Sequence, residues 1–228
     1  MESEVGFQTL FFPRANMQGG IVNLKPIFMK TLHCLLFLSC WLVAMRAPVD
    51  LPLEIGAPLP KGDLVLQDCS GKEITLNKAR MNNGLLVMFS GNTCPYIERN
   101  QLRTQEICKY ALSNNIGVVL INSNIAAADE KAILAAMKTY ATGQQYNWYY
   151  VADKKAELAD AFEANHTPEC YLFNQQAKLV YKGAIDDNPG NAEAVKMRHL
   201  HNAINDMLAG KAVKVNSTMA LGCNIKRF

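Results

Sequence analysis

Two uninterrupted apolar runs constrain the fold more than any other feature of the sequence. LLVMFS at 85–90 and IGVVLINSN at 116–124 have the length and composition of buried strands. Between them, PYIERNQLRTQEICKYALSNN at 95–115 predicts a helix of roughly five turns. Because buried strands that alternate with helices form a sheet covered by those helices, an α/β fold is expected.

The segments on either side continue this alternation. LVLQD at 64–68 and KEITL at 72–76 flank a turn and predict a hairpin before the first buried run. Later segments predict a helix at 129–141, a strand at 148–153, a short helix at 154–165, a second hairpin at 169–185 and a last helix at 191–210. The order predicts a mixed sheet with helices on both faces, in one domain covering 48–210. Asp186 and Asp187 follow the second hairpin and are predicted to form a solvated turn.

Residues 1–47 are predicted to be a leader that precedes this domain. Residues 31–45, between Lys30 and Arg46, are mostly apolar and have the length of a signal-peptide core, short of the ~20 residues that span a bilayer comfortably. Met29 directly precedes Lys30 and is an alternative translation start. We expect export to an extracytoplasmic location, with membrane contact only through residues 31–45. A buried helix, a lipoprotein signal and a retained membrane anchor are the alternatives.

The cysteine pattern limits the chemistry of the domain. Of seven cysteines, Cys34 and Cys40 lie in the leader, which leaves five, and no pair has Cys-x-x-Cys spacing. Neither a zinc knuckle nor a dense disulfide framework is indicated, and no metal or cofactor is expected. In an exported protein an odd number implies at least one thiol that stays reduced or pairs transiently. Basic and acidic residues are interspersed for a net charge of +3, so nucleic acid is not an expected partner.

Cys94 stands at a position that suits a reactive thiol. A thiol reacts as the thiolate, and the free amides and dipole of a helix N-terminus favour that negative charge. Thr93 ends a short polar loop after the strand at 85–90, and Pro95 is typical of the first helical residue. We expect this arrangement to aim the sulfur at unpaired amides. The alternative is a structural cysteine at a strand-to-helix turn.

Four motifs occur in an order that resembles a known family. They are NTCPY at 92–96, TP before YLF at 167–173, LVYKGAIDD at 179–187 and GCNIK at 222–226. Together with the order of strands and helices, over about residues 50–226, they resemble the thioredoxin-fold redoxins of the alkyl hydroperoxide reductase and thiol-specific antioxidant superfamily. Within that superfamily the chain is most similar to a bacterial peroxiredoxin-like group, so the resemblance implies that the exported protein resides in the bacterial periplasm or envelope.

The resemblance implies roles for the residues of the first two motifs. Cys94 takes the place of the first cysteine of the thioredoxin active site, which is also the place of the peroxidatic cysteine. Thr167 and Pro168 take the place of the cis-proline loop beside that sulfur, where backbone groups can pair with a substrate chain. Thr93 and Pro95 complete the active-site loop.

Three positions depart from the patterns of related families. Ile97 stands where a thioredoxin has its second cysteine, so a local two-cysteine disulfide cannot form. Gly91 and Val87 stand where peroxiredoxins have Thr or Ser and Pro, and Gly91 also replaces a cysteine common in the peroxiredoxin-like group. The usual polar group that holds a peroxide is therefore absent.

The resolving thiol has several candidates. Cys108 lies ~21 Å along the same predicted helix from the nucleophile, beyond the ~7 Å limit between disulfide-bonded Cα atoms. Cys69 falls in a hairpin turn, and Cys170 is expected in the core. The resemblance implies a cysteine at Cys223, in the basic tail 211–228, which is predicted to be mobile. Cys223 is therefore the first candidate, and a second protein or a small thiol is the next.

The sequence thus predicts a thiol-dependent redox protein that uses Cys94 as its nucleophile, either a peroxiredoxin-like antioxidant or a thiol-disulfide oxidoreductase. Its expected partners are a thiol reductant or thioredoxin-like donor and a peroxide or protein-disulfide substrate. The alternative is a non-catalytic thioredoxin-fold module that binds peptides or acts as a chaperone. The missing second cysteine favours the alternative, whereas retention of Cys94 and Cys223 favours the enzyme.

Overall fold

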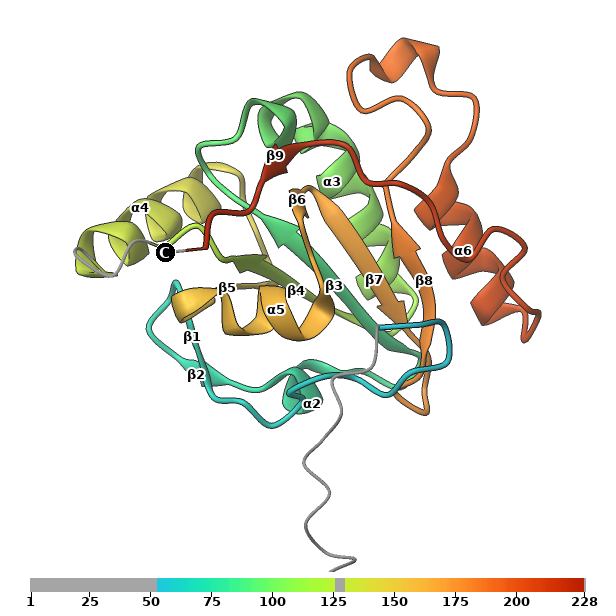
Figure 1. Cartoon of the computed structure of the whole chain (residues 1–228), viewed down its shortest axis with the longest axis horizontal. Helices are drawn as coiled ribbons and strands as arrows, with labels where there is room; N and C mark the ends of the chain where they lie inside the picture. Colours follow the sequence, from blue (N-terminus) through green and yellow to red (C-terminus); the bar gives the residue numbers. More distant parts are fainter. Residues whose placement is uncertain (1–52, 126–129, 228) are drawn as a thin grey trace, which may run out of the picture. The chain divides into compact units, whose positions relative to one another are not determined.

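A seven-stranded mixed sheet forms the centre of the domain (Figure 1). The computed structural model describes residues 53–125 and 130–227, all within the unit Asp50–Phe228, so the predicted leader lies outside the described residues. No helix in this described part combines the length and apolar character needed to cross a membrane. In the order in which they lie side by side, the strands are β2 (Glu73–Ile74), β1 (Leu66–Asp68), β5 (Tyr149–Ala152), β4 (Ile116–Asn122), β3 (Gly84–Ser90), β7 (Glu169–Phe173) and β8 (Leu179–Gly183).

The two apolar runs form the central strands of this sheet, as predicted. β3 pairs with β4 in parallel from Gly84 opposite Ile116 to Ser90 opposite Asn122, and every residue of both strands is buried. β5 continues the parallel part, whereas β1, β7 and β8 add antiparallel pairs at the two edges. The long crossover between β3 and β4 is the helix that carries the candidate site.

Helices cover both faces of the sheet, so the predicted fold class is confirmed. One face packs against α3 (Pro95–Ser113), α4 (Glu130–Gly143) and α6 (His199–Leu208), and the other against α2 (Leu76–Ala79) and α5 (Glu157–Phe162). Because neighbouring residues of a strand point to opposite faces, Met88 enters the first of these two cores and Val87 the second.

The structure departs from the predicted elements in the last third of the chain. The helix predicted at 191–210 is shorter, because a separate 3-10 turn, η3 (Ala192–Ala194), and extended backbone at Val195 precede α6. α6 ends at Leu208, and Gly210 follows it with a φ of 67°, in the left-handed region that glycine adopts readily after a helix. Two short strands that were not predicted, β6 (His166–Thr167) and β9 (Cys223–Asn224), pair with each other beside the main sheet.

Candidate functional site

Cys94 is the last residue before α3, and a short loop brings it there from the end of β3. Its carbonyl oxygen accepts hydrogen bonds from the amides of Ile97 and Glu98, and Pro95 is the first helical residue, as predicted. The side chain is 6% exposed and makes no capping hydrogen bond. The prediction that its sulfur is directed at the helix amides is therefore wrong in this oxidised state, because a bond to another sulfur draws the side chain toward a neighbouring loop.

That neighbouring loop contains a cis peptide bond between Thr167 and Pro168, as the resemblance implied. Thr167 is completely buried, and its carbonyl oxygen lies 3.4 Å from Cys94 Sγ. A carbonyl oxygen only accepts hydrogen bonds, so it can accept one from a Cys94 thiol but cannot stabilise the thiolate. The loop thus positions the sulfur without supplying a donor to it.

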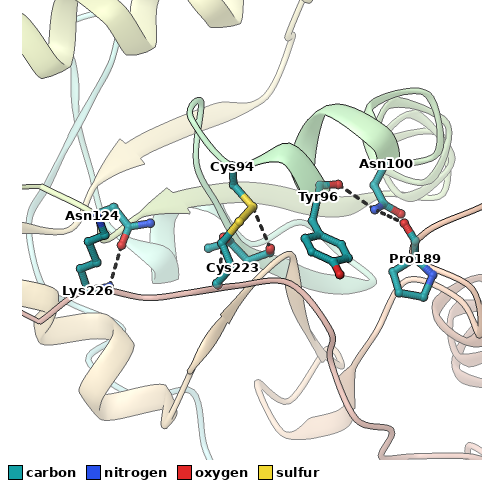
Figure 2. The surroundings of a disulfide bond; sticks show 8 residues. Cys94, Tyr96, Asn100, Asn124, Pro189, Cys223 and Lys226 are labelled. Carbon is teal, nitrogen blue, oxygen red and sulfur yellow. Dashed lines mark hydrogen bonds between the residues drawn. A yellow bond between two sulfur atoms is a disulfide. The ribbon is translucent and has the colours of Figure 1, made fainter.

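A disulfide joins Cys94 to Cys223, which lies 129 residues further along the chain (Figure 2). The S–S distance is 2.22 Å and the two Cα atoms are 6.1 Å apart. Cys223 is half-buried, directly beside the cis-proline loop. The tail therefore brings the sulfur of a second cysteine directly to the buried sulfur of Cys94.

The tail is held on both sides of its cysteine. We call residues 216–227 the C-terminal strap; it runs from β8 across the candidate site to α5 (Figure 1). At its start the carbonyl oxygen of Asn216 accepts a hydrogen bond from the amide of Lys182. At its end the Arg227 guanidinium pairs with the Asp160 carboxylate at 2.6 Å. The predicted mobility of the tail is therefore wrong for the strap, which is packed against the domain.

The middle of the strap lies directly on β6. β9 pairs with β6 in antiparallel fashion, which sets Cys223 opposite Thr167. Two positions after the cysteine, Ile225 is 5% exposed and belongs to the core of the α2 and α5 face. A Cβ atom on Gly222 would lie 2.1 Å from the carbonyl oxygen of Thr167, so the strap needs glycine there to come this close.

The remaining residues of the predicted active-site loop lie at its rim. Thr93 and Pro95 are exposed on either side of the buried cysteine, whereas Ile97 points into the protein. A Cβ atom on Gly91 would lie 3.7 Å from the side-chain nitrogen of Asn124, which is an ordinary van der Waals contact, so close packing does not require glycine here. Among the described residues, no group of three or more His, Cys, Asp and Glu side chains is arranged to hold a metal ion.

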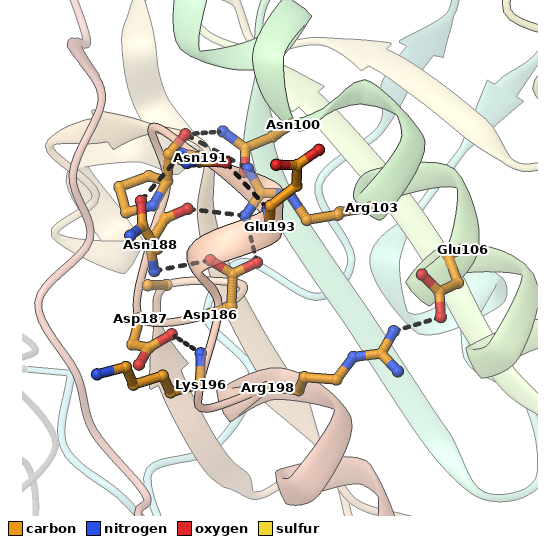
Figure 3. A network of polar contacts seen from close by, with 12 residues as sticks. Asn100, Arg103, Glu106, Asp186, Asp187, Asn188, Asn191, Glu193, Lys196 and Arg198 are labelled. Atoms are coloured by element: carbon orange, nitrogen blue, oxygen red, sulfur yellow. Dashed lines mark hydrogen bonds and ion pairs between the residues drawn. The ribbon is translucent and has the colours of Figure 1, made fainter.

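A buried ion pair fixes the loop after β8 to the side of α3 (Figure 3). Arg103 donates to the Asp186 carboxylate at 2.5 Å and to the carbonyl oxygen of Asn188 at 2.9 Å. One turn earlier on the helix, the Asn100 amide donates to the carbonyl oxygen of Pro189 at 3.0 Å. The second and third turns of the helix that begins after Cys94 are thus tied to this loop.

The solvated turn predicted for Asp186 and Asp187 is only half correct. Asp187 is exposed, but the side chain of Asp186 is 4% exposed and that of its partner Arg103 is 13% exposed. A buried carboxylate needs a cation or several donors to be stable. One sequence signal could have indicated this buried polar contact. Asn100 and Thr104 lie at helical spacing from the apolar residues of α3 and are buried with them, so polar residues recur on the buried face of the helix.

The other described cysteines are unsuited to thiolate chemistry. Burial raises the pKa of the Cys108 and Cys170 thiols well above the usual value for cysteine, and both side chains lie in the core. Burial, with a smaller contribution from the Asp68 carboxylate, raises the pKa of Cys69 to about 11. Near neutral pH these three therefore remain protonated, and the disulfide contains the cysteines that are placed for redox chemistry.

The rate of alkylation should distinguish Cys94 and Cys223 from the other three described cysteines. After mild reduction of the folded chain at about pH 8, iodoacetamide should label Cys94 and Cys223, label Cys69 slowly, and leave Cys108 and Cys170 unlabelled, because the thiolate is the reacting form. Labelling of Cys69 should speed up as the pH rises toward its raised pKa of about 11. Peptide mapping by mass spectrometry measures each site. Labelling of Cys108 as fast as Cys94 would contradict the expectation.

A thioredoxin-like sheet with a cysteine before its long helix and a cis-proline beside the sulfur defines a redoxin. The chain belongs to the AhpC/TSA family, whose model matches residues 55–182. Members of this family include peroxiredoxins and thiol-disulfide oxidoreductases. The match ends before the strap, so the family model does not include Cys223.

Solved structures support the fold. An uncharacterized conserved protein from Geobacillus kaustophilus is 27% identical, with a TM-score of 0.70, over 76% of this chain and 92% of that one. A hypothetical protein from Sinorhizobium meliloti is 30% identical, with a TM-score of 0.69, over 78% of this chain and 97% of that one. A mutant of PrxQ from Xylella fastidiosa, 17% identical with a TM-score of 0.53 over 69% and 97%, shares the fold. No curated protein matches the chain significantly.

Proposed function

We propose that this redoxin is a thiol-dependent redox protein in which Cys94 is the nucleophile and Cys223 its resolving thiol. The observation that carries the proposal is the disulfide between these two cysteines, because a resolving thiol has to reach the nucleophile's sulfur. The cis-proline loop beside Cys94 and membership of a family of thiol enzymes support it. In a non-catalytic peptide-binding module the same disulfide would only hold the strap to the domain, so repeated reduction and re-formation of this bond with a substrate distinguishes the two functions.

Thiol-disulfide exchange is the reaction that the surroundings of the sulfur favour. The Cys94 thiolate attacks a disulfide of a substrate protein, one substrate sulfur bonds to Cys94, and the other leaves as a thiolate. Cys223 then attacks Cys94 in this mixed disulfide, which releases the second substrate thiol and forms the Cys94–Cys223 disulfide. A thiol reductant or thioredoxin-like donor returns both cysteines to thiols.

Peroxide reduction is the second candidate, and family membership is the observation that favours it. In that reaction the Cys94 thiolate attacks one peroxide oxygen, the O–O bond breaks, and the other oxygen leaves as an alcohol or water after taking up a proton, which leaves Cys94 as a sulfenic acid. Attack by Cys223 then releases water and forms the same disulfide. Catalysis benefits from donors that polarise the peroxide bond. Gly91 offers no hydroxyl at the family's usual position, and the carbonyl of Thr167 only accepts, so we rank this reaction second.

The chain with Cys223→Ser should stop after the first step of either reaction. With a disulfide substrate it should accumulate a mixed disulfide at Cys94, and with hydrogen peroxide a sulfenic acid that dimedone traps there, because no second thiol completes the cycle. Intact mass and peptide mapping identify the adduct and thereby rank the two reactions. The matched control, Cys69→Ser, should turn over normally. Normal turnover by Cys223→Ser would remove Cys223 from the proposal.

A further inference from the structure

We infer that the C-terminal strap occupies β6, the strand before the cis-proline, in the manner of a substrate segment, and that it displays the sequence which a segment of another polypeptide needs in order to replace it there: glycine, cysteine, any residue, then an aliphatic residue. This inference rests on the proposed function, because the cysteine of that segment supplies the sulfur that Cys94 attacks.

The pairing between strap and β6 uses backbone groups that any extended chain possesses. His166 faces Asn224 and Thr167 faces Cys223 in an antiparallel ladder, and the amide of Ile225 donates to the carbonyl oxygen of Asn165 at 2.9 Å. Such strand addition binds through the main chain, while pockets for particular side chains select the sequence. The ladder also sets the sulfur of the added segment beside Cys94, as it does for Cys223 in Figure 2.

The side chains of the strap show where selection operates. At Gly222 a Cβ atom would meet the carbonyl oxygen of Thr167 at 2.1 Å and its carbon at 2.6 Å, and both are backbone atoms that a side-chain rotation cannot move. Ile225 is buried in the same apolar cluster as Leu158 and Phe162. Asn224 is exposed and is therefore free to vary. The resulting pattern is Gly-Cys-x-aliphatic.

Reduction opens this edge to competition, because it removes the one covalent bond that holds the second half of the strap. The contacts that remain are non-covalent: the ladder with β6, the buried side chain of Ile225, and hydrogen bonds that Lys226 and Arg227 donate to Asn124 and to the carbonyl oxygen of Ala164. The ion pair between Arg227 and Asp160 has side chains that are 40% and 61% exposed, and exposed pairs bind weakly. Met219 and Leu221 are largely exposed and add little apolar contact. The pairing of Asn216 with β8 keeps the strap nearby. Strap and partner thus compete for β6 once both cysteines are thiols.

Synthetic peptides test the inference on the full-length chain with Cys223→Ser. The probes are LGCNIK, LACNIK and LGCNDK, each with its cysteine in a mixed disulfide with thionitrobenzoate. The Cys94 thiol loses its proton to solvent and its sulfur attacks the peptide sulfur; the sulfur–sulfur bond to thionitrobenzoate breaks, and that group leaves as a coloured thiolate. We expect LGCNIK to react about tenfold or more faster than either variant peptide, because each change costs a steric or burial penalty at β6.

A second variant tests competition by the strap. Adding Gly222→Ala to Cys223→Ser should keep the strap off β6 and raise the rate with LGCNIK about tenfold, by the same steric clash. The matched control, Gly143→Ala, adds a Cβ atom in open space and should leave the rate unchanged. Equal rates for the three peptides, or no acceleration by Gly222→Ala, would overturn the inference.

A small disulfide separates failure of the inference from failure of the proposed function. Dithiobis-nitrobenzoate carries no peptide backbone, so its reaction with Cys94 reports nucleophilicity alone. Rapid reaction with this reagent and no discrimination among the peptides would overturn the peptide specificity and leave Cys94 as the nucleophile. No reaction of Cys94 with the reagent would overturn both proposals.

Discussion

Replacement of Cys94 by serine should reduce turnover by about 10³-fold or more while leaving the fold unchanged, because a serine hydroxyl is not ionised at neutral pH and has no general base here. Cys94 is buried but belongs to neither apolar core, so the smaller side chain leaves no cavity in them. Turnover is measured as reduction of a protein disulfide or peroxide by a thiol reductant, and the fold by near-ultraviolet circular dichroism of the reduced chain.

Cys170→Ser provides the stringent comparison for this result. Cys170 is a completely buried cysteine on β7, and its replacement places a hydroxyl in the core, so we expect lower stability but normal chemistry in the fraction that is folded. Unchanged turnover in Cys94→Ser would remove that cysteine from every mechanism considered above, whatever the behaviour of Cys170→Ser.

The largest expected loss of stability is that of Arg103→Ala, about 3–5 kcal/mol in the free energy of unfolding, because the buried carboxylate of Asp186 would lose its cation. The side chains of this pair are 13% and 4% exposed, and Arg103 also donates to the carbonyl of Asn188. The substitution should therefore release the loop after β8 as well. Urea unfolding followed by tryptophan fluorescence measures the change, since Trp148 is almost buried.

Arg198→Ala is the matched control for the ion pair. Arg198 pairs with Glu106, which lies on α3 as Arg103 does. The side chains of Arg198 and Glu106 are 52% and 58% exposed, and an exposed pair contributes about 1 kcal/mol or less. A loss of stability for Arg103→Ala as small as that for Arg198→Ala would show that burial does not strengthen the first pair. Recovery of stability in an Arg103→Met, Asp186→Leu double variant would attribute the loss to the unpaired charge.

The sequence was most informative where a segment's surroundings could be read from its own pattern. The residues of β3 and β4 are buried on both faces, and a strand with two buried faces must be apolar throughout, so these strands were evident. The position of Cys94 before a proline-initiated helix followed from local helix chemistry. The cis bond before Pro168 was expected only through the family resemblance.

The position of the strap and the ion pair between Arg103 and Asp186 could not be predicted from local sequence patterns, because each depends on contacts between residues far apart in the chain. β6 and β9 are two residues each, too short for a periodic pattern, and Thr167 pairs with a residue in a tail that reads as polar and basic. Arg103 and Asp186 are 83 residues apart. Only the fold of the sheet brings such groups together, so local patterns predicted solvent at Asp186 where the structure has a buried charge.

The separation of 129 residues between Cys94 and Cys223 has a consequence for biosynthesis. At about 5–20 residues per second, a ribosome adds the second of these cysteines about 6–26 s after the first. The two cysteines made in that interval, Cys108 and Cys170, become buried in the core as the sheet and α3 form. Until the strap has been synthesised, Cys94 therefore lacks the cysteine with which it forms its disulfide, and the bond can form only in the last stage of synthesis or after it.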